Sequence, residues 1–347
     1  MRSFPALRRR LIARLSPGVT QRLRLLKWAL TGPPPKADLG TSERASPDRA
    51  GPGRGAPATG PSVLPPGKTR LQQRRECVLT GVPANASILE IGPSHQPTLA
   101  RRDGFNTKNA DHLNRSGLIE KYQGHPGVDV SAIEDVDYVL TPGVPLATGI
   151  DERFDLVLAS HVLEHSTSLI DFVNDCAGLL NPGGTLALIL PDKRFCFDRF
   201  RERSSLGAVI DAATAKRRTH SVGALTEYAL YATRRGGSIA WGPAQRGRYE
   251  WVHGFDTARD LVAASDDETY VDIHRWVFTP HHLRLLLRDL AELDHVGIHE
   301  SFFHDTVGFE FFINLRADGP GCRLGRAELM TWADHEQRLS ERPRFAV

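Results

Sequence analysis

Two acidic residues and one glycine in the first third of the chain have the types and spacing of a nucleotide-binding site. A short apolar run, Ile88 to Ile91, stops abruptly at Gly92, which indicates a buried strand that ends in a tight turn. Glycine lets backbone approach a ligand closely because it has no Cβ. Glu90 lies near the end of this strand, and Asp111 follows after about twenty residues, the spacing at which an acidic side chain binds ribose hydroxyls. Alone, such a glycine is more often an ordinary turn, so the surrounding elements must decide.

From residue 87 onward, apolar runs of strand length alternate with segments of helical length. The apolar residues of segment 167–180 fall on one helix face, and an Asn-Pro-Gly-Gly run ends that helix. This alternation predicts a parallel sheet with right-handed crossovers, whose carboxyl edge is where ligands bind. Only a few residues separate the last two strands, so they should pair as an antiparallel hairpin. The predicted strands are 88–90, 105–110, 136–140, 154–159, 185–190, 296–303 and 309–315, and further helices are predicted at 71–82 and 280–293.

Outside the alternating region, composition divides the chain. Residues 1–32 mix basic and apolar side chains and contain no acidic one. This pattern is typical of a weak anchor on an anionic membrane surface or of a solvated tail. We favour the solvated tail. Residues 33–67 are rich in Pro, Gly, Ala and Ser and predict a disordered linker. The folded domain is predicted over 68–318, with an insertion at 195–279 that lacks a strand rhythm. A charged tail covers 319–347.

The overall composition excludes several classes of protein. The chain has 347 residues, 40% of them hydrophobic and 24% charged, as in soluble globular proteins. A net charge of +3 is too small to indicate nucleic acid as a partner. The four cysteines are scattered without a C-x-x-C pair, so they predict reduced thiols in a cytoplasmic protein and neither a disulfide framework nor a zinc site. No apolar run has the length of a membrane span or of a secretory signal.

Four motifs, in this order, resemble class I S-adenosylmethionine-dependent methyltransferases over roughly residues 71–316. They are L-E-I-G-P at 89–93, Asp111, F-D-L-V-L-A-S-H-V-L-E-H at 154–165 and L-N-P-G-G-T-L at 180–186. The resemblance implies an α/β, Rossmann-like fold: a mostly parallel seven-stranded sheet with an antiparallel last strand, here with a cap insertion. More narrowly, L-P-D-K-R-F-C-F-D at 190–198 and F-T-P at 278–280 are similar to predicted bacterial methyltransferases associated with cell-surface polysaccharide genes.

The resemblance also implies roles for individual residues toward the cofactor, S-adenosyl-L-methionine. Glu90 and Gly92 would lie beside its methionine part, Asp111 would bind the ribose, and the adenine would lie near Asp137 to Thr141. Ser160 and His161 would flank the amino acid part or the reacting methyl group. The usual glycine loop, E/D-x-G-x-G-x-G, keeps only its first glycine here, so the loop must hold the cofactor with a stiffer backbone or use Ser94 as a donor.

Methyl transfer from a sulfonium is an in-line displacement, so the protein chiefly aligns and desolvates the nucleophile. A hydroxyl nucleophile also benefits from a general base. His161, His165 and Asp192 are the predicted catalytic candidates, because they follow strands at the ligand edge or open the next helix. Packing, capping or a charged turn is the alternative interpretation for each. The predicted substrate-binding residues are Lys193 and Arg194 for an anionic group, and His253, Asp272 and His274 in the insertion.

We predict no metal site, because D-x-H at 272–274 with one further histidine elsewhere is a poor metal signature. The favoured function is methylation, on oxygen, of a sugar-containing or other polar small molecule or glycan by a cytoplasmic enzyme (EC 2.1.1). One alternative is a non-catalytic scaffold with the same fold at the membrane surface. The altered glycine loop and the basic segment 1–32 favour this alternative. A nucleotide-cofactor oxidoreductase is the other alternative, and the missing G-x-G-x-x-G and the terminal hairpin disfavour it.

Overall fold

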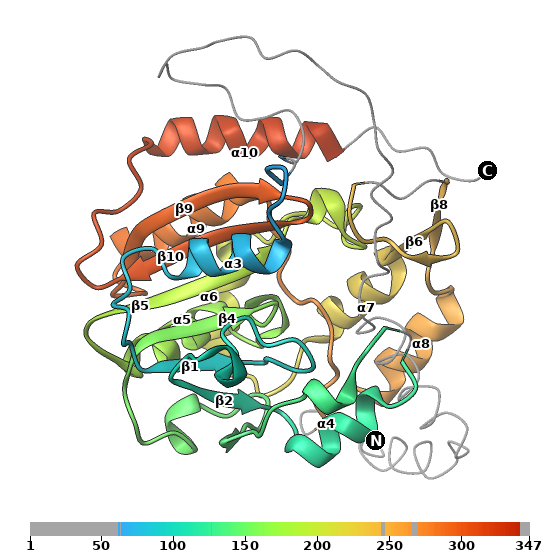
Figure 1. Ribbon diagram of the computed structural model, residues 1–347. Coiled ribbons are helices and arrows are strands. Elements are labelled where there is room, and N and C mark those ends of the chain that lie inside the picture. The colour runs from blue at the N-terminus through green and yellow to red at the C-terminus, as the bar shows by residue number, and fades with distance from the viewer. Residues whose placement is uncertain (1–61, 63, 126, 244–246, 266–268, 341–347) are drawn as a thin grey trace, which may run out of the picture.

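The computed structural model describes residues 62, 64–125, 127–243, 247–265 and 269–340, and a seven-stranded sheet forms its centre (Figure 1). The strand order is β3-β2-β1-β4-β5-β10-β9. Strands β1 to β5 are parallel, and β10 runs antiparallel to both of its neighbours, β5 and β9. The predicted mostly parallel sheet with a terminal antiparallel hairpin is therefore confirmed. The strands are β1 Ile88–Ile91, β2 Thr107–Asp111, β3 Tyr138–Val139, β4 Phe154–Ser160, β5 Leu180–Pro191, β9 His299–Val307 and β10 Glu310–Arg316.

Alternating side chains of the central strands pack against helices on both faces of the sheet. On β4, Val157 and Ala159 join a core with helices α5 (Leu169–Gly178) and α9 (Pro280–Glu292). Their neighbours Leu156 and Leu158 point to the opposite face, where they pack with Cys77 and Val78 of helix α3 (Arg70–Val78). A strand segment covered on both faces must be apolar, which explains the apolar runs 156–159 of β4 and 186–190 of β5.

Local sequence signals place the helix ends close to where they were expected. Thr69 begins α3 with a capping box to Gln72, and the side chain of Ser168 accepts a hydrogen bond at the start of α5. Pro280 occupies the first turn of α9, as predicted from Thr279-Pro280, although the Thr279 side chain makes no capping bond. The third strand is only two residues long, shorter than the predicted 136–140, and it pairs with β2 at the edge of the sheet.

The insertion folds into a small cap with its own core around Phe197, Tyr228 and Ile273. The cap has its own three-stranded sheet with the order β7-β6-β8. The helices of the cap cover part of the edge of the central seven-stranded sheet (Figure 1). The lack of a strand rhythm in the sequence is explained by these very short strands. The elements are α6 Leu206–Ala215, α7 Val222–Tyr231, β6 Thr233–Arg235, β7 Ser238–Ile239, β8 Tyr249–Trp251 and α8 Phe255–Ala264.

The two ends of the domain contact the sheet and helix α9. At the N-terminal side, the backbone N–H of Ser62 donates to Thr306 on β9 (3.0 Å), so the domain begins a few residues before the predicted start. The predicted basic segment 1–32 and most of the predicted linker 33–67 lie outside the described residues. In the predicted tail, helix α10 (Arg326–Ser340) packs on α9 with Leu329 and Ala333 buried. Within the part of the chain that the structure describes, none of the helices combines the length and apolar character needed to cross a bilayer.

Candidate active site

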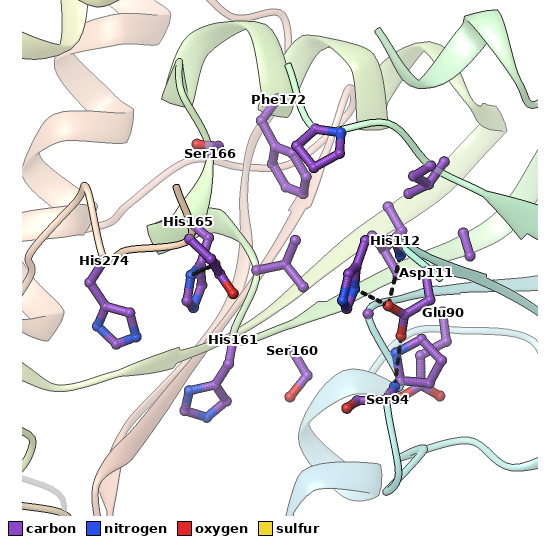
Figure 2. A pocket seen from close by; sticks show the side chains of 18 of the residues that line it. Glu90, Ser94, Asp111, His112, Ser160, His161, His165, Ser166, Phe172 and His274 are labelled. Atoms are coloured by element: carbon purple, nitrogen blue, oxygen red, sulfur yellow. Dashed lines mark hydrogen bonds and ion pairs between the residues drawn. The ribbon is translucent and has the colours of Figure 1, made fainter. Parts of the chain in front are cut away.

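A cavity of about 1080 Å³ lies along the carboxyl ends of β1, β2 and β4 and reaches under the insertion. Small-molecule sites in proteins typically measure about 300–1,000 Å³, so this one has room for a nucleoside-sized cofactor and a second molecule. One end of the cavity, here called the loop end, is formed by Glu90, Gly92, Ser94 and Asp111. The other, the imidazole end, is formed by His161, His165, Asp272 and His274 (Figure 2).

Gly92 shapes the loop end through its missing side chain. Its φ is +69°, a conformation that L residues rarely adopt. A Cβ at this position would lie 2.7 Å from Cγ2 of Val162, which follows β4. The turn after β1 therefore requires glycine both for its backbone conformation and for the close approach of the two strand ends.

Ser94 stands where the usual loop has its second glycine, and it keeps a glycine-like backbone with φ +55°. Its N–H donates to Oδ2 of Asp111 (3.0 Å), and its hydroxyl lies 2.5 Å from the hydroxyl of Tyr122. The loop therefore preserves the shape of the glycine loop while its serine anchors it to β2 and to helix α4 (Arg115–Tyr122).

Asp111 presents a fixed carboxylate at the end of β2. The residue is buried, and its Oδ1 accepts from the backbone N–H of His112 (2.7 Å) and lies 2.5 Å from Nδ1 of the same residue. A carboxylate offers about four lone-pair positions, so these contacts and the one from Ser94 leave acceptor capacity on a cavity-lining group. This arrangement fits a ligand with hydroxyl donors such as ribose.

Glu90 lines the cavity but uses its carboxylate to fasten the loop. Its two oxygens accept from the backbone N–H groups of Thr98 (2.7 Å) and Leu99 (2.9 Å). Burial raises the pKa of Glu90 against the effect of these bonds. Asp137 was expected near the adenine, but it does not line the cavity. Its Oδ2 accepts instead from the backbone N–H of Asn109 (2.7 Å). Residues 140–145, just after β3, line that side of the cavity.

His161 is held between two buried carboxylates at the end of β4. Its Nε2 lies 2.8 Å from Oε1 of Glu310, and its Nδ1 lies 3.4 Å from Oε1 of Glu164. Burial would lower the pKa of His161, but the interactions with these two carboxylates outweigh it and raise that pKa. An imidazolium with both nitrogens engaged is a poor proton acceptor, so the geometry gives His161 a positioning role. Its φ of +52° shows that the surrounding structure imposes this position.

Glu310, the first residue of β10, and Arg74 of α3 complete this group. The Nε of Arg74 donates to Oε2 of Glu310 (3.0 Å), and both residues line the cavity. Burial would raise the pKa of Glu310, but Arg74 and His161 outweigh it and hold that pKa well below its usual range. Neither residue of this pair was predicted from the sequence. The signal for Glu310 was an acidic residue inside the apolar run F-E-F-F-I of the last strand.

Two further histidines at the imidazole end are each oriented by a carboxylate. The Nδ1 of His165 lies 2.8 Å from Oδ1 of Asp272, and the Nδ1 of His274 lies 2.5 Å from Oδ2 of Asp198. Asp198 in turn accepts from Nη1 of Arg201 (2.8 Å). Burial opposes the charged form of His165, but Asp272 outweighs it and raises the pKa of His165. The predicted residues His161, His165, Asp272 and His274 are therefore brought together.

The structure keeps the other predicted residues away from the cavity lining. Asp192 and Arg194 are buried and paired with one another, with Nε of Arg194 2.9 Å from Oδ2 of Asp192. Lys193 donates from Nζ to the carbonyl of Arg199 (2.9 Å), and burial lowers its pKa to about 8. His253 lies in the insertion, where burial lowers its pKa to about 4. The contacts of these residues stabilise the fold around the end of β5 and in the cap. These residues have no part in the proposed chemistry.

Comparisons with known proteins find a matching family and similar solved structures. Residues 127–188 match the family described as "Methyltransferase domain". No curated protein matches the sequence significantly. Similar solved structures include the CcbJ methyltransferase from Streptomyces caelestis (14% identity, 72% of this chain and 97% of that one, TM-score 0.37). The glycopeptide N-methyltransferase MtfA (13%, 74% and 94%, 0.36) and a methyltransferase from Clostridium acetobutylicum (10%, 71% and 89%, 0.37) are similar at the same level. With TM-scores this low, we draw no conclusion from these three likenesses.

Proposed function

We propose that this chain, a class I S-adenosylmethionine-dependent methyltransferase by its strand order and its methyltransferase-domain match, methylates an oxygen atom of a sugar-containing or other polar acceptor. The observation that carries the proposal is a single cavity with a nucleotide-type loop end and an imidazole end. The acceptor is a small molecule or a glycan.

The residues of the loop end fit the cofactor. S-adenosylmethionine supplies a methyl group on a sulfonium: an acceptor lone pair forms the new bond while sulfur leaves with the electrons of the C–S bond. Gly92 allows the turn after β1 to approach the end of β4 closely, and this turn lines the cavity where the methionine part would lie. The carboxylate of Asp111 has capacity for the ribose hydroxyls, and Glu90 keeps the loop closed by binding its backbone.

The imidazole end suits a hydroxyl nucleophile. A hydroxyl must lose its proton as the new O–C bond forms, so it needs a group that accepts the proton or acidifies the hydroxyl. The His165–Asp272 and His274–Asp198 pairs supply oriented imidazoles on the cavity wall. Aromatic residues from the insertion, among them Trp241, line the same region and offer flat apolar faces to a sugar ring.

The test measures S-adenosylhomocysteine release from the purified full-length chain with two acceptor panels. One panel holds nucleotide sugars and oligosaccharides that bear only hydroxyls, and the other holds amino sugars and peptide amines. Transfer to a hydroxyl acceptor, located by mass spectrometry of the product, is the expected result. Transfer confined to amines would overturn the oxygen assignment. Cofactor binding without transfer to either panel would instead support the non-catalytic scaffold.

The basic segment 1–32 lies outside the described residues, and its weak contact with an anionic membrane surface stays a prediction. Co-sedimentation with anionic and neutral vesicles, for the full chain and for a chain lacking residues 1–67, tests it. Binding to anionic vesicles that depends on the segment and weakens with salt would support peripheral attachment. Equal recovery of both chains in the supernatant would support the solvated tail.

A further inference from the structure

The imidazole end holds a group of side chains that can bind a metal ion. Glu164, His165 and His274 each offer one ligand atom, and these atoms lie within 4.8 Å of one another. Although the sequence pattern at 272–274 predicted no metal site, the fold brings His274 to Glu164 and His165, and we propose that these three residues bind a divalent transition-metal ion next to the acceptor. The proposal rests on the proposed function and deepens it, because it assigns the activation of the hydroxyl to a cation.

The two histidines carry the supporting contacts that metal-binding histidines need. Such histidines almost always donate their second ring nitrogen to a carboxylate or carbonyl, which fixes the ring and its tautomer. The Nδ1 atoms of His165 and His274 are engaged by Asp272 and Asp198, respectively. This arrangement leaves Nε2 of each ring as the nitrogen available to a cation.

Glu164 supplies the negative charge of the site. Its side chain is fully buried, and neither carboxylate oxygen has a hydrogen-bond partner among the described residues. Nδ1 of His161 lies at ion-pair distance, 3.4 Å from Oε1. Because His161 is shared with Glu310, a metal ion in contact with the oxygens of Glu164 would further compensate this buried charge.

The backbone brings the distant ligands together before any metal binds. The carbonyl of Glu164 accepts from the N–H groups of Arg275 (2.6 Å) and Trp276 (3.0 Å), immediately after His274. The hydroxyl of Tyr270 donates to the carbonyl of His165 (2.8 Å). These bonds join the 3₁₀ helix η4 (Leu163–His165) to the end of the insertion, so the positions of the three ligands are fixed by the fold.

The donor set indicates the class of ion. Two imidazoles and one carboxylate are typical of zinc, iron, cobalt and similar transition ions, whereas magnesium and calcium prefer oxygen ligands. Three protein ligands leave coordination positions for a substrate oxygen, and His165 and His274 line the cavity. Glu164 itself does not line it, so an acceptor would approach the ion from the imidazole side.

The chemistry follows from a Lewis acid at this place. An acceptor hydroxyl bound to the ion has a lowered pKa, and its proton leaves to water in the cavity. The oxygen lone pair then forms the bond to the methyl carbon, and the electrons of the C–S bond remain on sulfur. The ion keeps its oxidation state, so the step needs no oxidant or reductant. His165 acts as a ligand in this scheme.

The experiment uses the full-length chain, stripped with a chelator and titrated with Co²⁺. Visible absorption reports the ligand field, and elemental analysis after gel filtration gives the stoichiometry. One Co²⁺ per chain is expected, with affinity reduced at least 100-fold in His274→Ala and in the isosteric Glu164→Gln. Asp198→Asn, which removes the negative charge beside both His274 and Arg201, should weaken binding about 10- to 100-fold. His299→Ala, on the exposed surface of β9, is the control for adventitious binding and should leave the titration unchanged.

Each variant is checked for folding by thermal unfolding and by its affinity for S-adenosylhomocysteine, which the loop end should preserve. Methyl transfer that chelation abolishes and Co²⁺ or Zn²⁺ restores would support the catalytic role of the ion. The absence of a stoichiometric ion, together with full transfer in the chelator, would overturn the metal site and leave the proposed function intact. A stoichiometric ion without transfer to any acceptor would support the site and count against the proposed function.

Discussion

The loop end and the imidazole end of the cavity are built in different ways. Apart from Tyr122, the contacts described at the loop end join residues 90–112, and most of them use backbone N–H groups as donors to Glu90 and Asp111. The imidazole end joins side chains from the end of β4, the insertion, β10 and α3. The loop end, where we propose that the cofactor binds, is thus a local backbone frame, whereas the imidazole end, which we propose for the acceptor, consists of side chains that only the whole fold assembles.

The pKa values of buried histidines shift in opposite directions at the two ends. At the loop end, burial lowers the pKa of His95 to about 4, and both of its ring nitrogens lack hydrogen-bond partners among the described residues. At the imidazole end, carboxylates outweigh burial and raise the pKa of His161 and His165. The direction of the pKa shift of a buried histidine therefore depends on whether a carboxylate lies beside it.

The largest expected effect tests how far the imidazole end depends on long-range pairing. Glu310→Ala would leave Arg74 and His161 without their shared buried acceptor, so we expect a loss of about 3 kcal/mol in the free energy of unfolding. Denaturation in urea measures it. Asp256→Ala, which breaks an exposed pair with Arg259, is the matched control and should cost less than about 0.5 kcal/mol. Equal losses in the two variants would contradict the buried network.

The next largest effect is expected at Asp111 in the loop end. Asp111→Ala removes the acceptor for the ribose hydroxyls, so S-adenosylhomocysteine should bind at least tenfold more weakly, a loss of about 1.4 kcal/mol. Calorimetric titration measures the affinity. Asp137→Ala is the control, because that carboxylate lies outside the cavity lining and should leave the affinity unchanged. A reversed result would restore Asp137 as the cofactor contact.

A smaller effect isolates the strain in the altered glycine loop. Ser94→Gly and Ser94→Ala both lose the contact with Tyr122, but only alanine keeps a Cβ in the left-handed region. The glycine variant should therefore be more stable than the alanine variant by about 1 kcal/mol. Both stabilities come from thermal or urea unfolding. Equal stabilities would mean that the loop relaxes away from this conformation.

The smallest expected effect is a pH dependence that originates at the loop end. Because the pKa of His95 is lowered from 6.5 to about 4 in the folded chain, the unfolded chain binds more protons between these values. The free energy of unfolding should fall as pH decreases through this window, by less than about 1 kcal/mol in total because solvent screens the half-buried ring. His95→Gln should show a shallower decrease from pH 6.5 to 4. A parallel decrease in both proteins would exclude His95 as the source.

Much of the fold could be predicted from local patterns. The apolar runs around Leu89, Val157 and Leu188 and the turn signals after them predict buried parallel strands, and the structure confirms these strands. The elements of the insertion could not be predicted, because strands of two or three residues carry no periodicity. The residues of the loop end lie in the last residues of β1 and β2 or just after β1, so their spacing was enough to propose their places.

The sequence by itself determined the sheet, the turn at Gly92 and the carboxylate at Asp111, because strand periodicity and the spacing across one βαβ unit are local properties of the chain. Only the tertiary structure decided the imidazole end. His165 and His274 are more than a hundred residues apart, and Glu310 enters through a reversed strand, so no spacing rule relates them. Tertiary packing also removed Asp192 and Arg194 from the site, because a buried arginine and carboxylate side by side pair with one another before they can meet a ligand.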